Sequence, residues 1–294
     1  MCQFCTEHGE GKKWYLQMRN YSDELLHAEL SAKQKELARA QTRWEWNARF
    51  LGDFVTPAVG AISGAQSEDD ASSKTESVEA QPTEDEEVAR NQAVHFGQVL
   101  PIEDVEAVVD MVQSITRMPC GCRYITTGKE DKRYCFGIGV DKFGILGKFP
   151  EAASSLEVLE KGEAKSIIRD YDREGLMHSI WTGVTPYVIG LCNCDHDCLA
   201  YRGYIEERGT PWFFRAEYIA QTDWDACTGC KSCIKQCQFG AMFYSAALAK
   251  VYIDPTRCFG CGVCRAACHH DAISLTARQQ HPEAANLWLK PLPK

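Results

Sequence analysis

The sequence lacks the motifs that identify the common nucleotide-binding and hydrolytic enzymes. Its 294 residues contain no G-x-G-x-x-G fingerprint and no G-x-x-x-x-G-K-[ST] phosphate loop, so no dinucleotide or phosphate-loop site is predicted. A nucleophile elbow and an H-E-x-x-H zinc motif are missing as well. These absences leave no substrate site that a sequence motif can identify.

A basic surface and a membrane-spanning run are also missing. Asp and Glu number 41 against 32 Lys and Arg, which argues against a duplex nucleic-acid binder because such a protein needs basic side chains to neutralise phosphates. The uncharged stretch 175–194 is interrupted by glycine, proline and polar residues, so it predicts a buried strand–turn segment and no membrane span. The first eight residues contain no apolar run of a signal peptide, which predicts a soluble, cytoplasmic protein.

Cysteine, by contrast, is abundant, with 16 residues in the chain. This number allows disulfides, metal ligands or redox thiols. Disulfides need an oxidising compartment, and the chain shows no export signal, so metal binding is the first interpretation.

The composition divides the chain into five segments of an α+β protein. We expect an N-terminal Cys/His head and long helix, an acidic flexible linker, a central Cys-rich domain, a ferredoxin-like domain and a tail, over residues 1–63, 64–94, 95–215, 216–278 and 279–294. The linker prediction depends on residues 64–90, which hold nine acidic and two basic side chains and no aromatic one. Apolar residues recur every seven positions in 21–51, which predicts a helix that either docks on its own domain or binds a partner subunit.

The central segment predicts further helices before and after its first cysteines. Residues 101–117 start with a proline and two acidic residues and place apolar residues on one face, which is typical of a helix. Residues 151–174 predict one or two more helices.

Two cysteine runs of identical spacing lie in the C-terminal part of the chain. The pattern C-x2-C-x2-C-x3-C occurs at Cys227, Cys230, Cys233 and Cys237 and again, 31 residues later, at Cys258, Cys261, Cys264 and Cys268. Three cysteines spaced by three residues can wrap three irons of a [4Fe–4S] cluster, and the fourth can reach a second cluster. Each half is predicted to be a loop that holds three cysteines, followed by a short helix that starts near the fourth. Zinc is a poor alternative because the doubled run exceeds what zinc needs.

These runs resemble the bacterial-type ferredoxin with two [4Fe–4S] clusters. The resemblance implies that one cluster is held by Cys227, Cys230, Cys233 and Cys268, and the other by Cys258, Cys261, Cys264 and Cys237. The family has proline after the fourth cysteine of each run, where this chain has Gln238 and His269.

A second group of cysteines lies in the central segment. This group contains two C-x-C pairs, which are Cys120 with Cys122 and Cys192 with Cys194. Cys198 follows the second pair, and Cys135 lies between the two pairs in the sequence. A C-x-C pair on an extended segment directs both sulfurs to one side, and Cys194 and Cys198 would share a helix face. We predict a third cluster on Cys122, Cys192, Cys194 and Cys198, with Cys120 as the main substitute. Zinc and unliganded or redox-active thiols are the alternatives.

The order of these motifs is similar to that in multi-cysteine ferredoxin-like proteins of anaerobic bacteria. The motifs are C-G-C-R, then E-G-L-M-H, then C-N-C-D-H-D-C, and then the two ferredoxin runs.

Two histidines, His178 and His196, lie near the central cysteines in the sequence. Each is interpreted as an ordinary hydrogen-bonded residue or, alternatively, as a ligand or proton relay. At the N-terminus, Cys2, Cys5 and His8 have metal-like spacing but supply three ligands only. A zinc site, a fourth cluster completed by Cys120 or Cys135, and free thiols all remain open.

The main functional hypothesis is a soluble electron carrier. Two or three [4Fe–4S] clusters would pass single electrons between redox partner proteins, as part of a larger oxidoreductase complex. The alternative is an iron–sulfur enzyme whose central site is catalytic and receives electrons from the ferredoxin domain. A third hypothesis is a scaffold that the clusters hold together.

Overall fold

The computed structural model describes most of the central and C-terminal parts of the chain. The described residues are 3–9, 13–22, 89, 95, 97–129, 131–141, 144, 146–147, 154–184, 186–206 and 213–289. Cys2, nearly all of the helix predicted over 21–51 and nearly all of the acidic linker lie outside them. Helices and strands are mixed along the chain, which confirms the α+β class.

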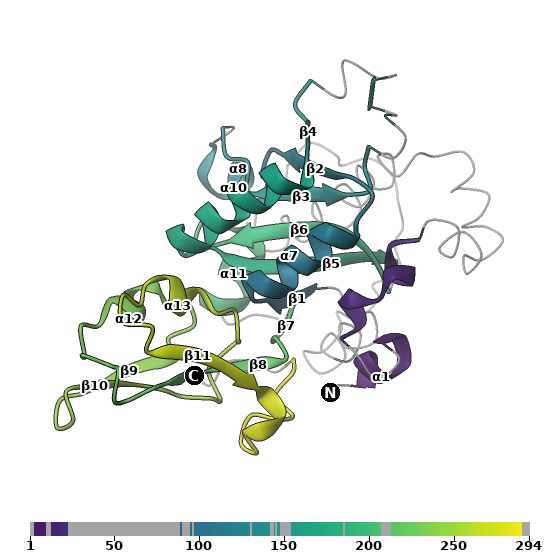
Figure 1. Cartoon of the computed structure of the whole chain (residues 1–294). Helices are drawn as coiled ribbons and strands as arrows, with labels where there is room; N and C mark the ends of the chain where they lie inside the picture. The colour runs from purple at the N-terminus through teal and green to yellow at the C-terminus, as the bar shows by residue number, and fades with distance from the viewer. Residues whose placement is uncertain are drawn as a thin grey trace, which may run out of the picture.

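A seven-stranded sheet forms the centre of the molecule (Figure 1). Its strands, in the order β4-β2-β3-β6-β5-β1-β7, are β1 (Gly97–Leu100), β2 (Ile115–Met118), β3 (Cys135–Ile138), β4 (Glu157–Leu159), β5 (Met177–Val184), β6 (Tyr187–Cys194) and β7 (Phe213–Phe214). All neighbours are antiparallel except β1 and β7, which are parallel. The hairpin β5–β6 confirms the strand–turn prediction for 175–194.

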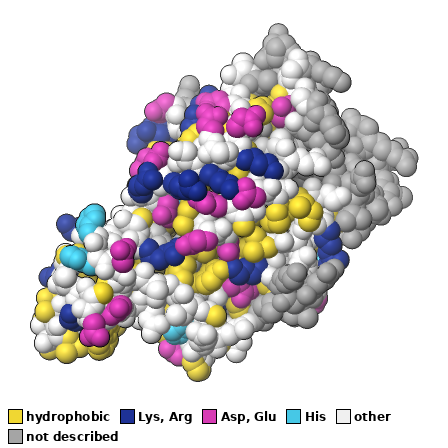
Figure 2. Space-filling model, viewed as in Figure 1, with side chains coloured by type: hydrophobic (Ala, Val, Ile, Leu, Met, Phe, Trp, Pro, Cys, Tyr) yellow, Lys and Arg dark blue, Asp and Glu magenta, His cyan; other side chains and the backbone are white. Residues whose placement is uncertain are grey.

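Two helices cover one face of this sheet. Helices α7 (Ile102–Met111) and α10 (Lys161–Glu174) pack against each other (Figure 1). Helix α7 begins after Pro101, and its valines at 105, 108 and 109 are buried in the core. Pairs of opposite charge cross the exposed side of the two helices, such as Lys165 with Asp110. Figure 2 accordingly shows Lys and Arg next to Asp and Glu along this face.

The helix predictions for the central segment were too long at one end. The predicted helix 101–117 stops at Met111, and residues 115–118 form β2, because Ile115 pairs with both β3 and β4. In the stretch 151–174, the structure has the short strand β4 before α10. Burial against a sheet favours the extended form for these β-branched residues.

The ferredoxin part contains two short sheets and two short helices. Strand β8 (Tyr218–Thr222) pairs with β11 (Ile273–Ala277), and β9 (Met242–Ser245) pairs with β10 (Lys250–Ile253). The helices are α12 (Ser232–Gln236) and α13 (Val263–Ala266). Each helix carries the third cysteine of its run and ends before the fourth, so the predicted helix start near the fourth cysteine is wrong. Lys231 and Gly262, both at positive φ, begin the helices one turn earlier.

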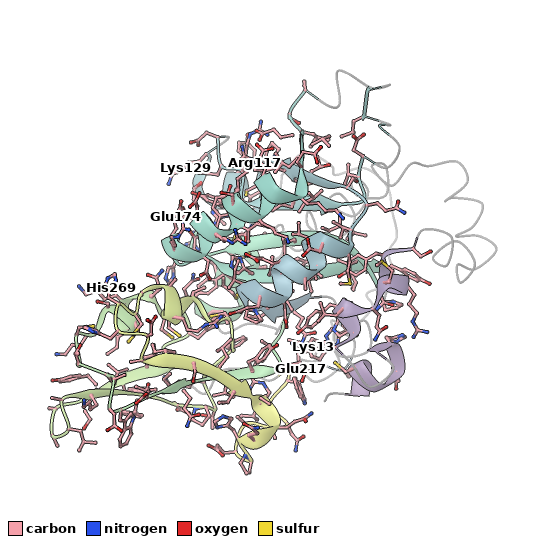
Figure 3. The ribbon with its side chains drawn as sticks, in the orientation of Figure 1. Lys13, Arg117, Lys129, Glu174, Glu217 and His269 are labelled. Carbon is pink, nitrogen blue, oxygen red and sulfur yellow. The ribbon has the colours of Figure 1, made fainter. Side chains whose placement is uncertain are left out.

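The N-terminal segment packs between the two parts. It contains α1 (Gln3–Gly9) and the short 3₁₀ helices Trp14–Leu16 and Met18–Tyr21. Trp14 is fully buried and its indole N–H donates to Gln98 Oε1 on β1 at 2.5 Å. Figure 3 shows Lys13 and Glu217 near each other where this segment meets the ferredoxin part.

The ferredoxin part and the central sheet share a buried core. The core contains Cys194 and Cys198 from the central region together with Phe239, Phe259 and Cys261 from the ferredoxin region. Helix α10 also contacts α13, and Glu103 of α7 forms an ion pair with Arg265 at 2.6 Å. No helix in the described part of the chain is long and apolar enough to span a membrane.

Candidate metal centres

Two cavities in the ferredoxin part are each lined by four cysteines. The first is lined by Cys227, Cys230, Cys233 and Cys268. The second is lined by Cys237, Cys258, Cys261 and Cys264. The fourth cysteine of each run therefore lines the cavity of the other run. This is the grouping that the ferredoxin resemblance implies, and its identity as two ligand sets stays a prediction.

The two cavities differ in their exposure to solvent. Cys230 in the first cavity is exposed, whereas Cys258, Cys261 and Cys264 in the second are buried. Burial raises the pKa of the Cys261 thiol, and it raises the pKa of Cys233 to about 11. A thiol with a raised pKa is a poor free nucleophile, so these cysteines need a cation or cluster to become thiolates.

Backbone amides donate to sulfurs of both cavities. Ala241 N–H donates to Cys237 Sγ at 3.4 Å, and Ala272 N–H donates to Cys268 Sγ at 3.3 Å. These two bonds occupy equivalent positions in the two halves of the repeat. Gly260 N–H donates to Cys258 Sγ at 3.4 Å. Such bonds stabilise thiolate ligands and raise the reduction potential of a cluster.

Two glycines allow the cysteine loops to lie close to the strands. Gly229 and Gly260 have φ of +70° and +73°, which is the left-handed region. A Cβ at either position would lie 2.2 Å from a backbone oxygen, that of Ala249 or Tyr218. Only glycine fits these positions without moving the backbone.

A buried arginine lies beside the second cavity. Arg278 is fully buried, and its guanidinium donates to the carbonyl of Cys258 at 3.0 Å and to that of Ala216 at 2.7 Å. Burial lowers its pKa to about 10, so it stays charged at neutral pH. A positive charge at this place offsets the negative charge that a thiolate-bound cluster carries.

The central cysteines converge although they come from four separate places in the fold. Cys120 and Cys122 belong to the turn into helix α8 (Gly121–Thr127), and Cys135 begins β3. Cys192 and Cys194 lie on β6, where Cys192 is directly opposite Cys135. Cys198 precedes the short helix α11 (Leu199–Tyr201), which continues as a π-helical turn at Arg202–Glu206.

Hydrogen bonds between thiols connect most of this group. The Cys135 thiol donates to Cys120 Sγ at 3.4 Å. This bond lowers the pKa of Cys120 to about 7 and raises that of Cys135. Bonds from Cys192 and Cys198 lower the pKa of Cys194. Burial, with Cys194 nearby, raises the pKa of Cys122 to about 11. The group thus contains both thiolate-favouring and thiol-favouring positions.

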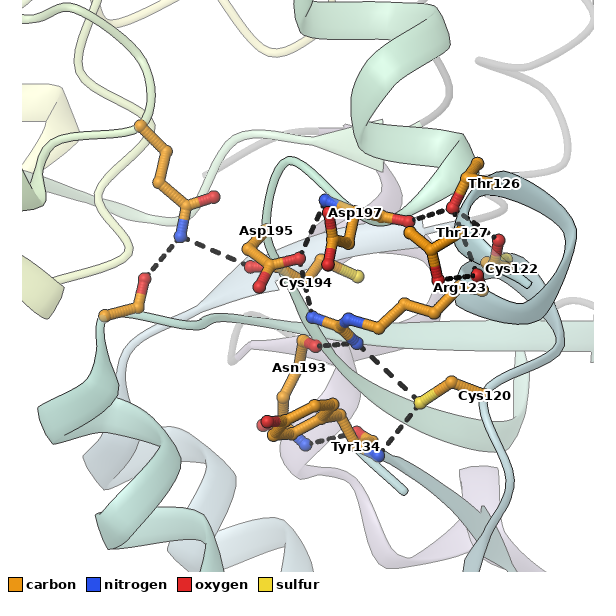
Figure 4. Close-up of polar contacts among 12 residues, drawn as sticks. Cys120, Cys122, Arg123, Thr126, Thr127, Tyr134, Asn193, Cys194, Asp195 and Asp197 are labelled. Carbon is orange, nitrogen blue, oxygen red and sulfur yellow. Dashed lines mark hydrogen bonds and ion pairs between the residues drawn. The ribbon is translucent and has the colours of Figure 1, made fainter. Parts of the chain in front are cut away.

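Arg123 is the buried cation of this group. Its guanidinium contacts Asp195 at 2.7 Å, the carbonyl of Asn193 at 3.1 Å and Cys120 Sγ at 3.7 Å (Figure 4). Its side chain is 1% exposed, so the charge acts through a medium of low dielectric constant. Arg123 therefore favours anionic sulfur around it, which is what cluster ligation needs.

Two details of the sequence prediction for this site were wrong. Cys120 and Cys122 do not lie on an extended segment, because Cys120 caps α8 and Cys122 is in its first turn. Cys194 and Cys198 do not share a helix face, because Cys194 ends β6. Cys135, which the sequence placed only nearby, joins the group through its register on β3. Sheet pairing, which no local pattern encodes, brings it there.

The described cysteines form no disulfide. Across the described ranges, no three His, Cys, Asp or Glu side chains are arranged to hold one ion. Four thiolates on one tetrahedral zinc at 2.3 Å would lie about 3.8 Å from one another. A cubane gives each ligand its own iron and separates the sulfurs further. A cluster and a zinc ion both stay predictions for the central cysteines.

The two histidines have structural partners. His178 is fully buried, its Nδ1 lies 2.6 Å from Asn193 Oδ1, and its Nε2 lies 3.4 Å from Asp172. The ring of His196 packs edge-on against Tyr201 at 5.1 Å. The interpretation of His178 as a hydrogen-bonded core residue is confirmed.

Cys5, the described one of the two N-terminal cysteines, contacts the chain just before the ferredoxin strands. Cys5 is fully buried, and its thiol donates to Glu217 Oε1 at 3.0 Å. Cys120 and Cys135, which were considered as completing ligands, contact each other instead. The predicted zinc site or fourth cluster at Cys5 and His8 receives no support from these contacts.

Gln238 links the central group to the second cavity. Its side-chain amide donates to the backbone carbonyl of Cys194 at 3.3 Å and to that of Gly175. The backbone carbonyl of Gln238 accepts a hydrogen bond from the Tyr201 hydroxyl. Gln238 directly follows Cys237, a residue of the second cavity. Gln238 stands where bacterial-type ferredoxins have proline, and a proline could not make these side-chain bonds.

The two cavities and their repeat define a class. Residues 226–273 match the 4Fe-4S dicluster domain family, which confirms the resemblance to two-cluster ferredoxins for this part of the chain.

Relatives of known name extend the comparison. The chain is 36% identical over 109 residues to the indolepyruvate oxidoreductase subunit IorA of Pyrococcus horikoshii, which is 37% of this chain and 16% of that protein. The same subunit of Thermococcus kodakarensis is 29% identical over 109 residues, with the same coverage. The archaeal-type glutamate synthase (NADPH) of Thermotoga maritima is 36% identical over 59 residues, which is 20% of this chain and 12% of that protein.

The chain therefore matches only a small part of each relative. What is common to the matches is the iron–sulfur domain within an oxidoreductase, which supports [4Fe–4S] clusters and a role in electron transfer.

Proposed function

We propose that the protein transfers single electrons through three [4Fe–4S] clusters. Two are held in the ferredoxin part by the two cysteine sets that line its cavities, and the third is held in the central part. The proposed central ligands are Cys122, Cys192, Cys194 and Cys198. The supporting observation is that Cys194 and Cys198, with Cys192 packed against them, lie in the same buried core as Cys261 of the second cavity.

Each protein group has a defined task in this proposal. The clusters, when bound, supply the one-electron chemistry. The cysteines hold them, and the amides of Ala241, Gly260 and Ala272 donate to the ligand sulfurs. Arg123 and Arg278 provide buried positive charge. The surrounding apolar side chains exclude water and fix the distances between the sites.

The exposure of the sites suggests an order for the electrons. The first cavity reaches the surface at Cys230, and the tip of β9–β10 beside it exposes Leu248 and Tyr252 at 54% and 44%. Figure 2 shows hydrophobic side chains gathered at this end of the molecule. A redox partner would bind here, the electron would pass next to the more buried second cavity, and the central site would follow. The named relatives suggest that the partner is a component of a multi-subunit oxidoreductase in the cytoplasm.

Iron counting in matched variants tests the third cluster. The protein is purified without oxygen, and iron and acid-labile sulfide are measured per chain in Cys194→Ser and in Cys5→Ser. Both cysteines are buried, but only Cys194 belongs to the proposed ligands. We expect Cys194→Ser to lose about four irons from about twelve, and Cys5→Ser to keep them all. Equal iron in both variants would contradict the central ligand set, and a loss in Cys5→Ser would favour a metal site at the N-terminus.

A further inference from the structure

The central site contains more thiols than one cluster can use. Six cysteines converge there, and a cubane takes four. The two outside the proposed ligand set are Cys120 and Cys135. Their sulfurs contact each other at 3.4 Å, at one end of a row of thiol contacts that continues through Cys192 to Cys194 and Cys198.

Paired strands hold these two cysteines in place. Cys135 lies opposite Met118 in the β2–β3 ladder, two residues from Cys120. The backbone N–H of Cys120 donates to Lys132 O at 2.8 Å, and the N–H of Tyr134 donates to Cys120 Sγ at 2.9 Å. The pairing of β2 with β3 therefore keeps the two side chains facing each other, and none of these contacts involves a proposed cluster ligand.

The distance between the two sulfurs suits a bond between them. A disulfide has its sulfurs about 2.0 Å apart, so the sulfurs must approach by about 1.4 Å from the observed 3.4 Å. Small side-chain rotations on two neighbouring segments are enough for that approach.

We propose that Cys120 and Cys135 form a redox-active dithiol–disulfide couple next to the central cluster, a proposal that rests on the proposed electron-transfer function. In the reducing direction, the disulfide would accept one electron from each of two reduced clusters, its S–S bond would break, and two protons from solvent would complete the two thiols. In the oxidising direction, the two thiols would release two protons and give one electron to each of two oxidised clusters, and the S–S bond would form.

The contacts give this couple a short path to the cluster ligands. Cys135 lies directly opposite Cys192 on β6, and their thiols are hydrogen-bonded. Arg123 contacts Cys120 and the backbone of Asn193, which stands between Cys192 and Cys194. The couple would let one-electron carriers deliver electrons to chemistry that needs two at once.

Disulfide mapping in the intact holoprotein tests the couple. The holoprotein is held without oxygen at a series of potentials, free thiols are blocked under denaturing conditions, and tryptic peptides are analysed by mass spectrometry. Cleavage at Arg117, Arg123, Arg133 and Lys142 places Cys120 and Cys122 on peptide 118–123 and Cys135 on peptide 134–142. Fragmentation distinguishes Cys120 from Cys122. We expect the two peptides to be linked through Cys120 at high potential and separate after the clusters are reduced.

Single variants separate this couple from ligation. Cys120→Ser and Cys135→Ser should each keep the wild-type iron content and abolish the linked peptide, with Cys5→Ser as the control that changes neither. A loss of about four irons in either variant would show a cluster ligand and overturn the couple. A wild-type protein that never forms the linked peptide would overturn it too. A wild-type iron content near eight would remove the third cluster instead, while the peptide readout still decides whether the two thiols form a couple.

Discussion

The contact made by Gln238 predicts how the two halves of the molecule hold together. Replacing Gln238 by alanine removes the side-chain hydrogen bonds to the carbonyls of Cys194 and Gly175. It leaves the Cys237 thiol and the bond from Ala241 to it unchanged. The matched control is His269→Ala, at the equivalent place after the fourth cysteine of the second run. His269 is exposed and points away from the central sheet (Figure 3).

The expected cost follows from the number of bonds. Each hydrogen bond contributes about 0.5–1.5 kcal/mol net, and freeing the glutamine side chain returns up to about 1 kcal/mol of conformational entropy. The variant should therefore lose about 1–2 kcal/mol of local stability. This free energy corresponds to a roughly 5–30-fold rise in opening of the segments that the two bonds connect.

Hydrogen–deuterium exchange measures this opening directly. In Gln238→Ala, protection should fall by that factor over residues 194–201 and 237–241, at unchanged iron content. In His269→Ala, the same segments should exchange as in the wild type. Equal effects of the two substitutions, or no effect of either, would refute the role of Gln238 as the link between the sites.

Three further predictions concern single residues. Arg278→Gln removes a buried charge beside Cys258. A unit charge at roughly 8 Å and an effective dielectric constant of about 20 is worth about 2 kcal/mol, so redox-monitored EPR should show that the potential of one cluster is lower by about 90 mV. An unchanged potential would contradict this electrostatic effect of Arg278. Asp104→Asn weakens an ion pair to Lys13 at 2.8 Å and a hydrogen bond from Tyr15 at 2.8 Å. Urea unfolding should show that the free energy of unfolding falls by about 2–3 kcal/mol. A fall below about 0.5 kcal/mol would mean that these contacts contribute no more than surface ion pairs do. Gly260→Ala forces a Cβ to 2.2 Å from the carbonyl oxygen of Tyr218. The purified variant should contain about four irons fewer than the wild type. Full iron content would show that the loop carrying Cys258 and Cys261 can move to make room.

The ferredoxin part could be predicted closely because its information is local. Cys227, Cys230 and Cys233 lie within seven residues, so spacing alone predicts a loop around a cluster. The crossing of the fourth cysteine to the other cavity came from the resemblance, and the cavities have the same grouping. Only the helix starts were misplaced, because the positive φ of Lys231 and Gly262 is not visible in a cysteine pattern.

The central part could be predicted only in outline. The strand–turn at 175–194 was recognisable from its lack of charge, but the seven-stranded sheet depends on pairing between distant segments. The inclusion of Cys135 follows from its position opposite Cys192 in β3 and β6. Register is set by the whole sheet and not by a few residues, so no spacing rule could have found it.

The N-terminal segment shows a further limit of spacing rules. Cys5 and His8 have metal-like spacing, yet Cys5 donates to Glu217, which lies more than two hundred positions further along the chain. A thiol that is buried against a carboxylate looks the same in sequence as a metal ligand. The contacts of Lys13 and Trp14 with α7 and β1 were likewise invisible, because their partners are distant in the chain.

The central claim is that the chain carries a third cluster in addition to those of its dicluster domain. The most direct measurement is the iron and acid-labile sulfide content of the anaerobically purified wild-type protein, combined with EPR spectra during stepwise reduction by dithionite. Three [4Fe–4S] clusters predict about twelve irons and three reducible paramagnetic centres per chain. About eight irons and two centres would contradict the claim, and would leave the central cysteines without a cluster.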